Sequence, residues 1–262
     1  MTKRDFGIEE MMKAGMHFGH QTHRRNPKMD PYIFGVRSGI HIMDLTKTGP
    51  MLNIALDFLE SIKESGKQII FVGTKRQASP LVKQYAIKCD MPYVNQRWLG
   101  GLLTNFGTIS TRLKLLRELD VRYAKDDFED MTKKEKVMLD RQYKALQTTL
   151  GGVKNMTEIP GAIFVTDATK DRIAIKEANK LGVPVVALAD TNTHPEGIDY
   201  LIPANDDAKS SLEFVLNLVA TSCSVASKVQ PKEDEQGSPS ATLGSHVGKG
   251  GKTEEKKEEI VK

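Results

Sequence analysis

The chain has 262 residues, enough for one large domain or two modest ones with a sizeable core. Its formal net charge is +4, and its hydrophobic content of 39% is low for a globular protein, which indicates an extended or disordered part. Cys89 and Cys223 form no C-x-x-C pair, and we find no signal peptide or membrane-length apolar run. These features argue against a secreted disulfide scaffold or a membrane protein and predict a cytoplasmic one.

The N-terminal part of the chain is basic. We expect a short helix over 8–16, ending near Gly15, and then a loop-rich arm to about residue 47, where Asn26-Pro27 marks a turn. The arm holds five basic residues against two acidic ones: Arg24, Arg25, Lys28, Arg37 and Lys47 against Asp30 and Asp44. Clustered positive charge attracts a polyanion, although a solvated surface is the ordinary interpretation of one such run.

Strands and helices alternate through most of the remaining chain. Apolar runs predict strands at 67–73, 91–95, 162–165, 183–189 and 200–202, and helical spacing predicts helices at 51–64, 77–88, 171–181 and 207–222. This alternation is typical of an α/β fold with a parallel sheet between two layers of helices, as in flavodoxin-like or Rossmann-like domains.

Residues 104–150 interrupt the alternation. Two series of apolar residues repeat at heptad spacing: Ile109, Leu113, Leu116 and Tyr123, then Leu139, Tyr143, Leu146 and Leu150. Thr132 and Glu135 have the capping-box spacing that begins a helix. We therefore predict an inserted antiparallel coiled-coil hairpin.

The C-terminal segment from residue 228 is polar and low in complexity, so we predict a disordered tail. The predicted organisation is an α/β domain at 1–103 plus 151–227, a hairpin at 104–150 and a tail at 228–262.

The stretch 96–106 is the most informative one for function. It contains Arg97, the only tryptophan at Trp98, and the pair Gly100-Gly101. An arginine beside an aromatic ring suits a phosphate backbone with stacked bases, and a glycine pair lets the backbone approach another surface. The alternative is a tight turn with Trp98 in the core.

A second candidate is the loop Gly73-Thr74-Lys75-Arg76, which follows a predicted strand and precedes a predicted helix. Such a loop can hold a phosphate, although it has neither glycine-rich nucleotide-binding motif and can equally be an ordinary connection. It lies in the region 73–118, which has eight basic residues against two acidic ones.

Catalytic and metal-binding chemistry is less well supported. Asp167 and Asp190 follow predicted strands, but no base or nucleophile completes a catalytic set, and loop capping explains both. The histidines His17, His20 and His23 have no cysteine nearby to complete a zinc site. We expect no enzyme activity, no cofactor and no metal.

Several blocks of the chain resemble the bacterial small ribosomal subunit protein two family. They are Ala14-Gly15-Met16-His17-Phe18-Gly19-His20-Gln21, Asn26-Pro27-Lys28-Met29, Phe71-Val72-Gly73-Thr74-Lys75-Arg76, Arg97-Trp98-Leu99-Gly100-Gly101-Leu102-Leu103-Thr104-Asn105, Ala174-Ile175-Lys176-Glu177-Ala178 and Asp190-Thr191-Asn192. The resemblance spans about residues 8–222. One departure is Arg25, where the family often has tryptophan.

The resemblance implies an α/β domain with a coiled-coil hairpin, bound to small-subunit ribosomal RNA between head and body. It also implies a role in docking ribosomal protein one, among other neighbouring small-subunit proteins. The resemblance implies no catalytic activity. The residues predicted to contact RNA are Arg24, Arg25, Lys28, Arg37, Lys75, Arg76, Arg97, Trp98, Gly100 and Gly101. Two alternatives remain at this point: an enzyme or nucleotide-binding module on the same sheet, and an adaptor whose hairpin binds a protein.

Overall fold

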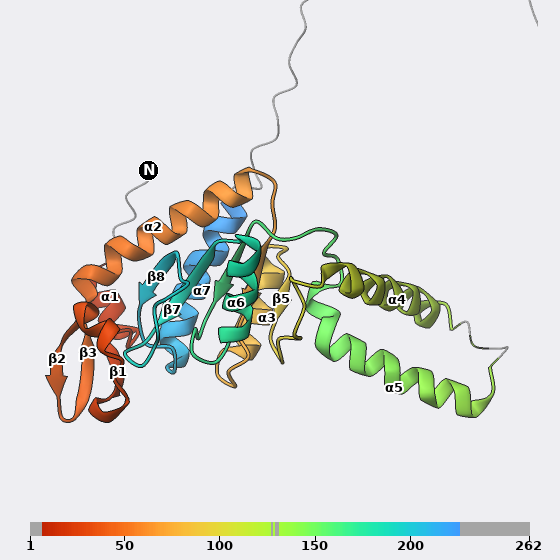
Figure 1. The fold of residues 1–262 in the computed structure, drawn as a ribbon, viewed down its shortest axis with the longest axis horizontal. Coiled ribbons are helices and arrows are strands. Elements are labelled where there is room, and N and C mark those ends of the chain that lie inside the picture. Colours follow the sequence, from red (N-terminus) through yellow and green to blue (C-terminus); the bar gives the residue numbers. More distant parts are fainter. Residues whose placement is uncertain (1–6, 127, 129–130, 226–262) are drawn as a thin grey trace, which may run out of the picture. The chain divides into compact units, whose positions relative to one another are not determined.

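The computed structural model describes residues 7–126, 128 and 131–225, so the tail predicted at 228–262 lies outside the described residues. Figure 1 shows the ribbon. The helices are α1 (Ile8–Lys13), α2 (Leu45–Glu64), α3 (Ser79–Lys88), α4 (Phe106–Ala124), α5 (Lys133–Leu150), α6 (Arg172–Leu181) and α7 (Lys209–Val225). The strands are β1 (Phe18–Gln21), β2 (Ile33–Arg37), β3 (Ile40–Met43), β4 (Ile69–Val72), β5 (Tyr93–Val94), β6 (Ala162–Val165), β7 (Val185–Ala189) and β8 (Tyr200–Pro203). Short 3₁₀ turns are η1 (Thr22–Arg24), η2 (Pro27–Tyr32) and η3 (Gly151–Val153).

The main sheet has five parallel strands in the order β5-β4-β6-β7-β8. Its central strands are apolar on both faces, since β4, β6 and β7 are buried throughout. Successive residues of a strand point to opposite faces. Ile69 and Phe71 of β4 therefore pack with α2, α3 and α7, while Ile70 and Val72 pack with α6 and the loop before α4. The predicted three-layer α/β arrangement of a parallel sheet with flanking helices is confirmed.

A second sheet occupies the arm that we expected to be loop-rich, so that prediction was wrong. It is antiparallel, in the order β1-β3-β2. Ser38 and Gly39 join β2 to β3 with φ values of 52° and 77°, the left-handed pair that closes a tight hairpin. The strands are only four or five residues long. In β2 the exposed residues Phe34 and Val36 are apolar, so its sequence lacks the alternation of apolar and polar residues that marks a half-buried strand.

Helix α2 begins at Leu45, six residues before the predicted start. Asp44 caps it by accepting a hydrogen bond from the Thr46 amide at 3.1 Å. Pro50 lies inside the helix and would ordinarily disfavour a helical residue before it. That residue is Gly49, which has no side chain to meet the proline ring, and this explains why the helix continues through the proline.

Helices α4 and α5 fall within 104–150 as predicted, and they lie side by side (Figure 1). The rings of Tyr123 and Tyr143 stack between them with centroids 4.3 Å apart. The Tyr143 hydroxyl donates to Asp120 at 2.8 Å, and the Tyr123 hydroxyl donates to Asp140. Whether the pair is a coiled coil and a separate insertion stays a prediction.

Candidate nucleic-acid interface

The N-terminal arm is fixed to the carboxyl end of strand β7. The Asn26 amide donates to the Thr191 carbonyl at 2.8 Å, and the His20 amide donates to the Thr191 hydroxyl at 2.9 Å. A side-chain carbon at Gly19 would lie 2.5 Å from the Thr191 side chain, so glycine is required for this close approach. The basic residues of the arm are therefore held on a rigid support.

Four predicted RNA contacts lie on this arm, and all four are exposed: Arg24, Arg25, Lys28 and Arg37. Arg25 pairs with Asp30 at 3.3 Å, and Lys28 pairs with Glu196. Both ion pairs are solvent-exposed, so they contribute little to stability, and either cation can exchange its carboxylate partner for another anion. Within the described residues, Arg24 and Arg37 have no ion-pair partner.

Lys75 is placed differently from these residues, because its side chain is only 16% exposed and its ammonium lies among carboxylates. It is 2.7 Å from Asp206, 2.7 Å from Asp207 and 3.3 Å from Asp167. Burial works against the charged form, but the hydrogen bonds to Asp206 and Asp207 outweigh it and raise the pKa of Lys75. The lysine charge is thus neutralised within the protein.

His20 and Asp190 border the same acidic cluster. His20 Nδ1 is 3.0 Å from Asp190 Oδ2, and the hydrogen bond to Asp190 raises the pKa of the imidazole. In the part of the chain that the structure describes, one group could supply three metal ligands: His20, Asp190 and Asp206 have donor atoms within 4.8 Å of one another. The three histidines 17, 20 and 23 do not form such a group; His17 instead packs on the ring of Phe18.

The loop after β4 makes its contacts inside the protein. The Thr74 amide and hydroxyl both donate to Asp171, at 3.2 and 2.7 Å. A side-chain carbon at Gly73 would lie 2.6 Å from both Thr166 and Val82, so this glycine serves packing of the strand against its neighbours. Arg76 is exposed beside this occupied loop. Asp167 accepts the amides of Thr169 and Lys170, as expected for loop capping.

Glu177 organises the loop at 98–104. Its carboxylate is nearly buried and accepts hydrogen bonds from Trp98 Nε1 at 3.1 Å and from the Gly101 amide at 2.7 Å. The amides of Leu103 and Thr104 and the Thr104 hydroxyl complete the set at 3.1 to 3.2 Å. Trp98 is only 5% exposed and belongs to the core. Gly101 has a φ of 86°, which favours glycine, while Arg97 and Gly100 are exposed.

Our sequence reasoning missed Glu177 as a functional residue, although a signal for it exists. Ala174 and Ala178 are on the buried face of α6, and Glu177 falls on the same face at helical spacing. A glutamate on a buried face requires partners, since a buried charge must be hydrogen-bonded.

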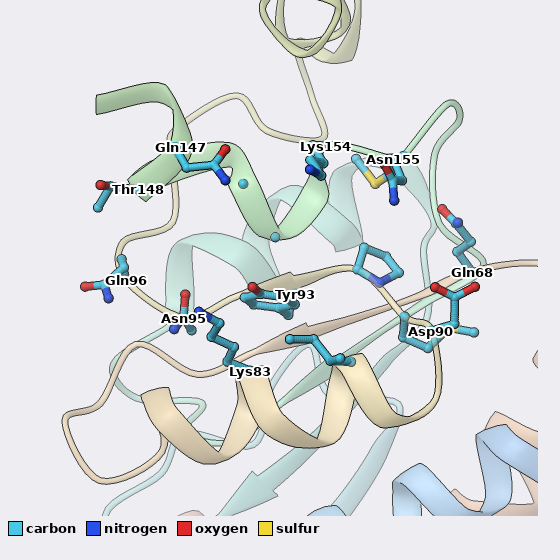
Figure 2. Close-up of a pocket in the computed structure, with 16 residues that line it drawn as sticks. Gln68, Lys83, Asp90, Tyr93, Asn95, Gln96, Gln147, Thr148, Lys154 and Asn155 are labelled. Carbon is cyan, nitrogen blue, oxygen red and sulfur yellow. The ribbon is translucent and has the colours of Figure 1, made fainter. Parts of the chain in front are cut away.

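A polar cavity of about 570 Å³ lies beside β5, and its wall is drawn in Figure 2. Carboxamides dominate the labelled lining, together with Tyr93 and Lys83. None of the predicted RNA contacts lines it. A second cavity of about 300 Å³ does contain one, Arg24, together with His20 and Asp190.

The fold and these contacts define the class: a three-layer α/β scaffold protein with a rigidly mounted basic arm. In the described residues, no helix combines the length and apolarity needed to cross a bilayer. A family model described as Ribosomal protein S2 matches residues 11–226. The chain belongs to the ribosomal protein S2 family, a family of structural proteins of the small ribosomal subunit that serve translation and are not enzymes.

Curated relatives agree with this assignment. A protein of Psychromonas ingrahamii, named small ribosomal subunit protein uS2, is 51% identical over 82% of this chain and 88% of its own length. Relatives of the same name from Pseudoalteromonas translucida and Hahella chejuensis are 49% and 48% identical over 82% and 84% of the chain. The matched regions span 88% and 87% of the lengths of those two proteins.

Proposed function

We propose that the chain binds small-subunit ribosomal RNA through exposed cations mounted on the arm and the two loops. The observation that carries the proposal is how the charges are divided between surface and interior. Six predicted contacts are exposed: Arg24, Arg25, Lys28, Arg37, Arg76 and Arg97. Such cations can neutralise phosphates and release counterions, which supplies most of the affinity for a nucleic acid.

The remaining predicted contacts act indirectly in this proposal. Lys75 holds the acidic cluster beside His20 of the arm. Trp98 and Gly101 shape the loop through Glu177, and Gly100 leaves its backbone open, since nothing lies within 4 Å of a side-chain carbon built there. RNA backbone or sugar groups can approach the chain closely at that point.

Salt-dependent RNA binding tests the proposal. The variant R24E/R25E/K28E/R37E and the wild-type full chain are titrated with small-subunit ribosomal RNA by filter binding over a range of salt concentrations. Each lost phosphate contact lowers the slope of log affinity against log salt by about one, so we expect a drop of up to about four.

A matched control reverses four exposed lysines of the helix pair instead: Lys125, Lys133, Lys134 and Lys144. It has the same net charge as the arm variant, so it separates the position of the charges from their sum. Equal affinities and slopes for the two variants would contradict an RNA interface on the arm.

We further propose that the chain lies between head and body of the subunit and helps to dock ribosomal protein one, as the family resemblance implies. The α4–α5 pair exposes three apolar side chains that a protein partner could cover: Val121, Val137 and Met138. The triple serine variant is expected to bind RNA normally and to retain less of purified ribosomal protein one in a pull-down. Undiminished retention would remove the pair from this docking role.

A further inference from the structure

The polar cavity beside β5 lies at one edge of the main sheet, yet this edge cannot accept an added strand. The carbonyls of Pro92 and Val94 accept amide hydrogen bonds from the β4 side, at 2.9 and 3.0 Å. The Tyr93 carbonyl between them therefore points away from the sheet. Gly152 of η3 covers it there, because a side-chain carbon built at Gly152 would collide with that oxygen. A partner peptide has no free edge to pair with, so the cavity suits a compact ligand.

We propose that this cavity holds a single unstacked nucleotide of RNA, an inference that rests on the RNA binding proposed above. Its volume of about 570 Å³ falls in the range of about 300–1,000 Å³ that small-ligand sites occupy. Unpaired RNA bases are held by aromatic rings and by polar groups that bond to their edges. The cavity wall supplies both kinds of group.

One end of the cavity presents hydrogen-bond acceptors. Oε1 of Gln68 is buried and has no hydrogen-bond partner in the described part of the chain. A buried carbonyl oxygen without a donor is costly, so a ligand N–H group that reaches it is favoured. Figure 2 shows the exposed Asp90 carboxylate at the same end. Every RNA base has an N–H or NH₂ group on its Watson–Crick edge that can donate there.

The other end of the cavity carries a cation. Asn95 donates from Nδ2 to the Ser79 carbonyl at 3.3 Å, which places it against the first turn of α3. Lys83 lies one turn further along this helix, on the Asn95 side of the cavity in Figure 2. It is exposed and has no ion-pair partner among the described residues, whereas Lys154 of the same wall is paired with Asp120 at 2.9 Å. One unpaired lysine matches the single charge of a phosphodiester.

Tyr93 lies between these two ends, as Figure 2 shows. The residue is half-buried, and a side-chain carbon at Gly152 would lie 2.7 Å from its ring, so the glycine leaves room for the ring. A base can stack on this ring while its edge points to Gln68 and its phosphate to Lys83. The wall thus defines one orientation for a nucleotide.

Nucleoside monophosphates test the cavity independently of the arm. The full chain and the arm variant are titrated with AMP, CMP, GMP and UMP, and NMR follows the side-chain amides of Gln68 and Asn95. We expect saturable shifts with at least one of the four nucleotides, and the same shifts in the arm variant. The arm can therefore fail to bind RNA without changing this result. Shifts confined to the arm, or no saturable shift with any nucleotide, would overturn the proposal.

A cavity-filling variant is Thr148→Trp, at an exposed position of α5 on the cavity wall. The Thr148 hydroxyl only bonds back to the Lys144 carbonyl, so the helix does not depend on it. The added ring should weaken monophosphate binding at least about tenfold. The control Gln142→Trp puts the same ring on an exposed part of α5 outside the cavity lining and should bind as the wild type does. Equal affinities for these two variants would contradict binding in the cavity.

A second variant, Lys83→Gln, keeps the inference testable if the tryptophan disturbs the fold. Lys83 is exposed, so its loss should leave the fold intact. We expect weaker binding of the monophosphate and unchanged binding of the matching nucleoside, which has no phosphate. Equal losses for both ligands, or no loss for either, would contradict the orientation proposed here.

Photo-crosslinking in the ribosome identifies the source of the nucleotide. Small subunits from cells that make the tagged full chain are irradiated with ultraviolet light, and their peptides are analysed by mass spectrometry. We expect an RNA nucleotide attached to the peptide that contains Tyr93, at least about tenfold less abundant in Thr148→Trp. A free mononucleotide or a peptide of another protein attached there instead, or no attachment at all, would contradict an RNA nucleotide in the cavity.

Discussion

Glu177 shows how one residue shapes the surface that carries Arg97. Its carboxylate accepts hydrogen bonds from two side chains and from three backbone amides of the loop before α4. Burial alone would raise the pKa of Glu177, but the amides of Gly101 and Thr104 and the Trp98 indole outweigh burial and lower it. The charged form is therefore part of the folded loop.

Substitution Glu177→Gln should destabilise the chain by about 2 kcal/mol, because an NH₂ group would replace one of the two accepting oxygens and leave donors unpaired. The free energy of unfolding from urea titration measures this loss. The exposed Glu118→Gln serves as control and should change stability by less than about 0.5 kcal/mol. Equal effects of the two substitutions would mean that the carboxylate does not hold the loop.

Asp206 gives a residue-scale prediction about pH. Burial and the neighbouring Asp167 and Asp190 raise the pKa of Asp206 to about 7. An unfolded aspartate titrates near 4, so between about pH 4 and 7 the folded chain binds more protons than the unfolded one. This group therefore makes stability fall as pH rises through that window.

Asp206→Asn should remove that contribution and flatten the decline in unfolding free energy between pH 5 and 7 by up to about 1 kcal/mol per pH unit. Unfolding in urea at several pH values measures the slope. Glu213→Gln, on α7 with a side chain that is 44% exposed, is the control and should keep the wild-type slope. An unchanged slope in the Asp206 variant would contradict this titration.

At the scale of elements, the start of α5 depends on a capping box that the sequence predicts and the structure contains. The Thr132 hydroxyl accepts from the Glu135 amide, and the Glu135 carboxylate accepts from the Thr132 amide at 2.9 Å. The helix is solvated along most of its length and buries only Leu150 fully. Its first turn therefore relies on local bonds more than on packing.

Thr132→Ala should cost about 1 kcal/mol and raise hydrogen exchange in the first turn of α5. The control Thr148→Ala removes a hydroxyl that only bonds back to the Lys144 carbonyl, at 2.7 Å. Because alanine is the better helix former, this control should be neutral or slightly stabilising. Faster hydrogen exchange in Thr148→Ala, or unchanged exchange in Thr132→Ala, would argue against the cap as the determinant of where α5 begins.

Elements with a strong hydrophobic signal could be predicted from the sequence, and weakly patterned ones could not. Ile69–Val72 and Ala162–Val165 are continuous apolar runs, and both are strands of the main sheet. The arm strands were missed because they are short and β2 leaves Phe34 exposed. The start of α2 was missed because Pro50 hides it.

For the molecule as a whole, the sequence indicated where cations cluster but not which of them pair with carboxylates inside the fold. Lys75 and Arg76 are neighbours in the chain, yet Lys75 meets three carboxylates from distant segments while Arg76 is exposed. Such pairings depend on the sheet order, which brings the loops after β4, β6 and β8 to one edge. The burial of Trp98 against Glu177 is likewise a tertiary contact.

The central claim is that the arm's exposed cations bind this protein to its ribosomal RNA. The most direct test is sedimentation, at physiological salt, of ribosomes from cells that make tagged chains. We expect the wild type and the helix-pair lysine variant to migrate with small subunits, and R24E/R25E/K28E/R37E to remain at the top of the gradient. Small subunits that carry the arm variant as fully as the wild type would contradict the account.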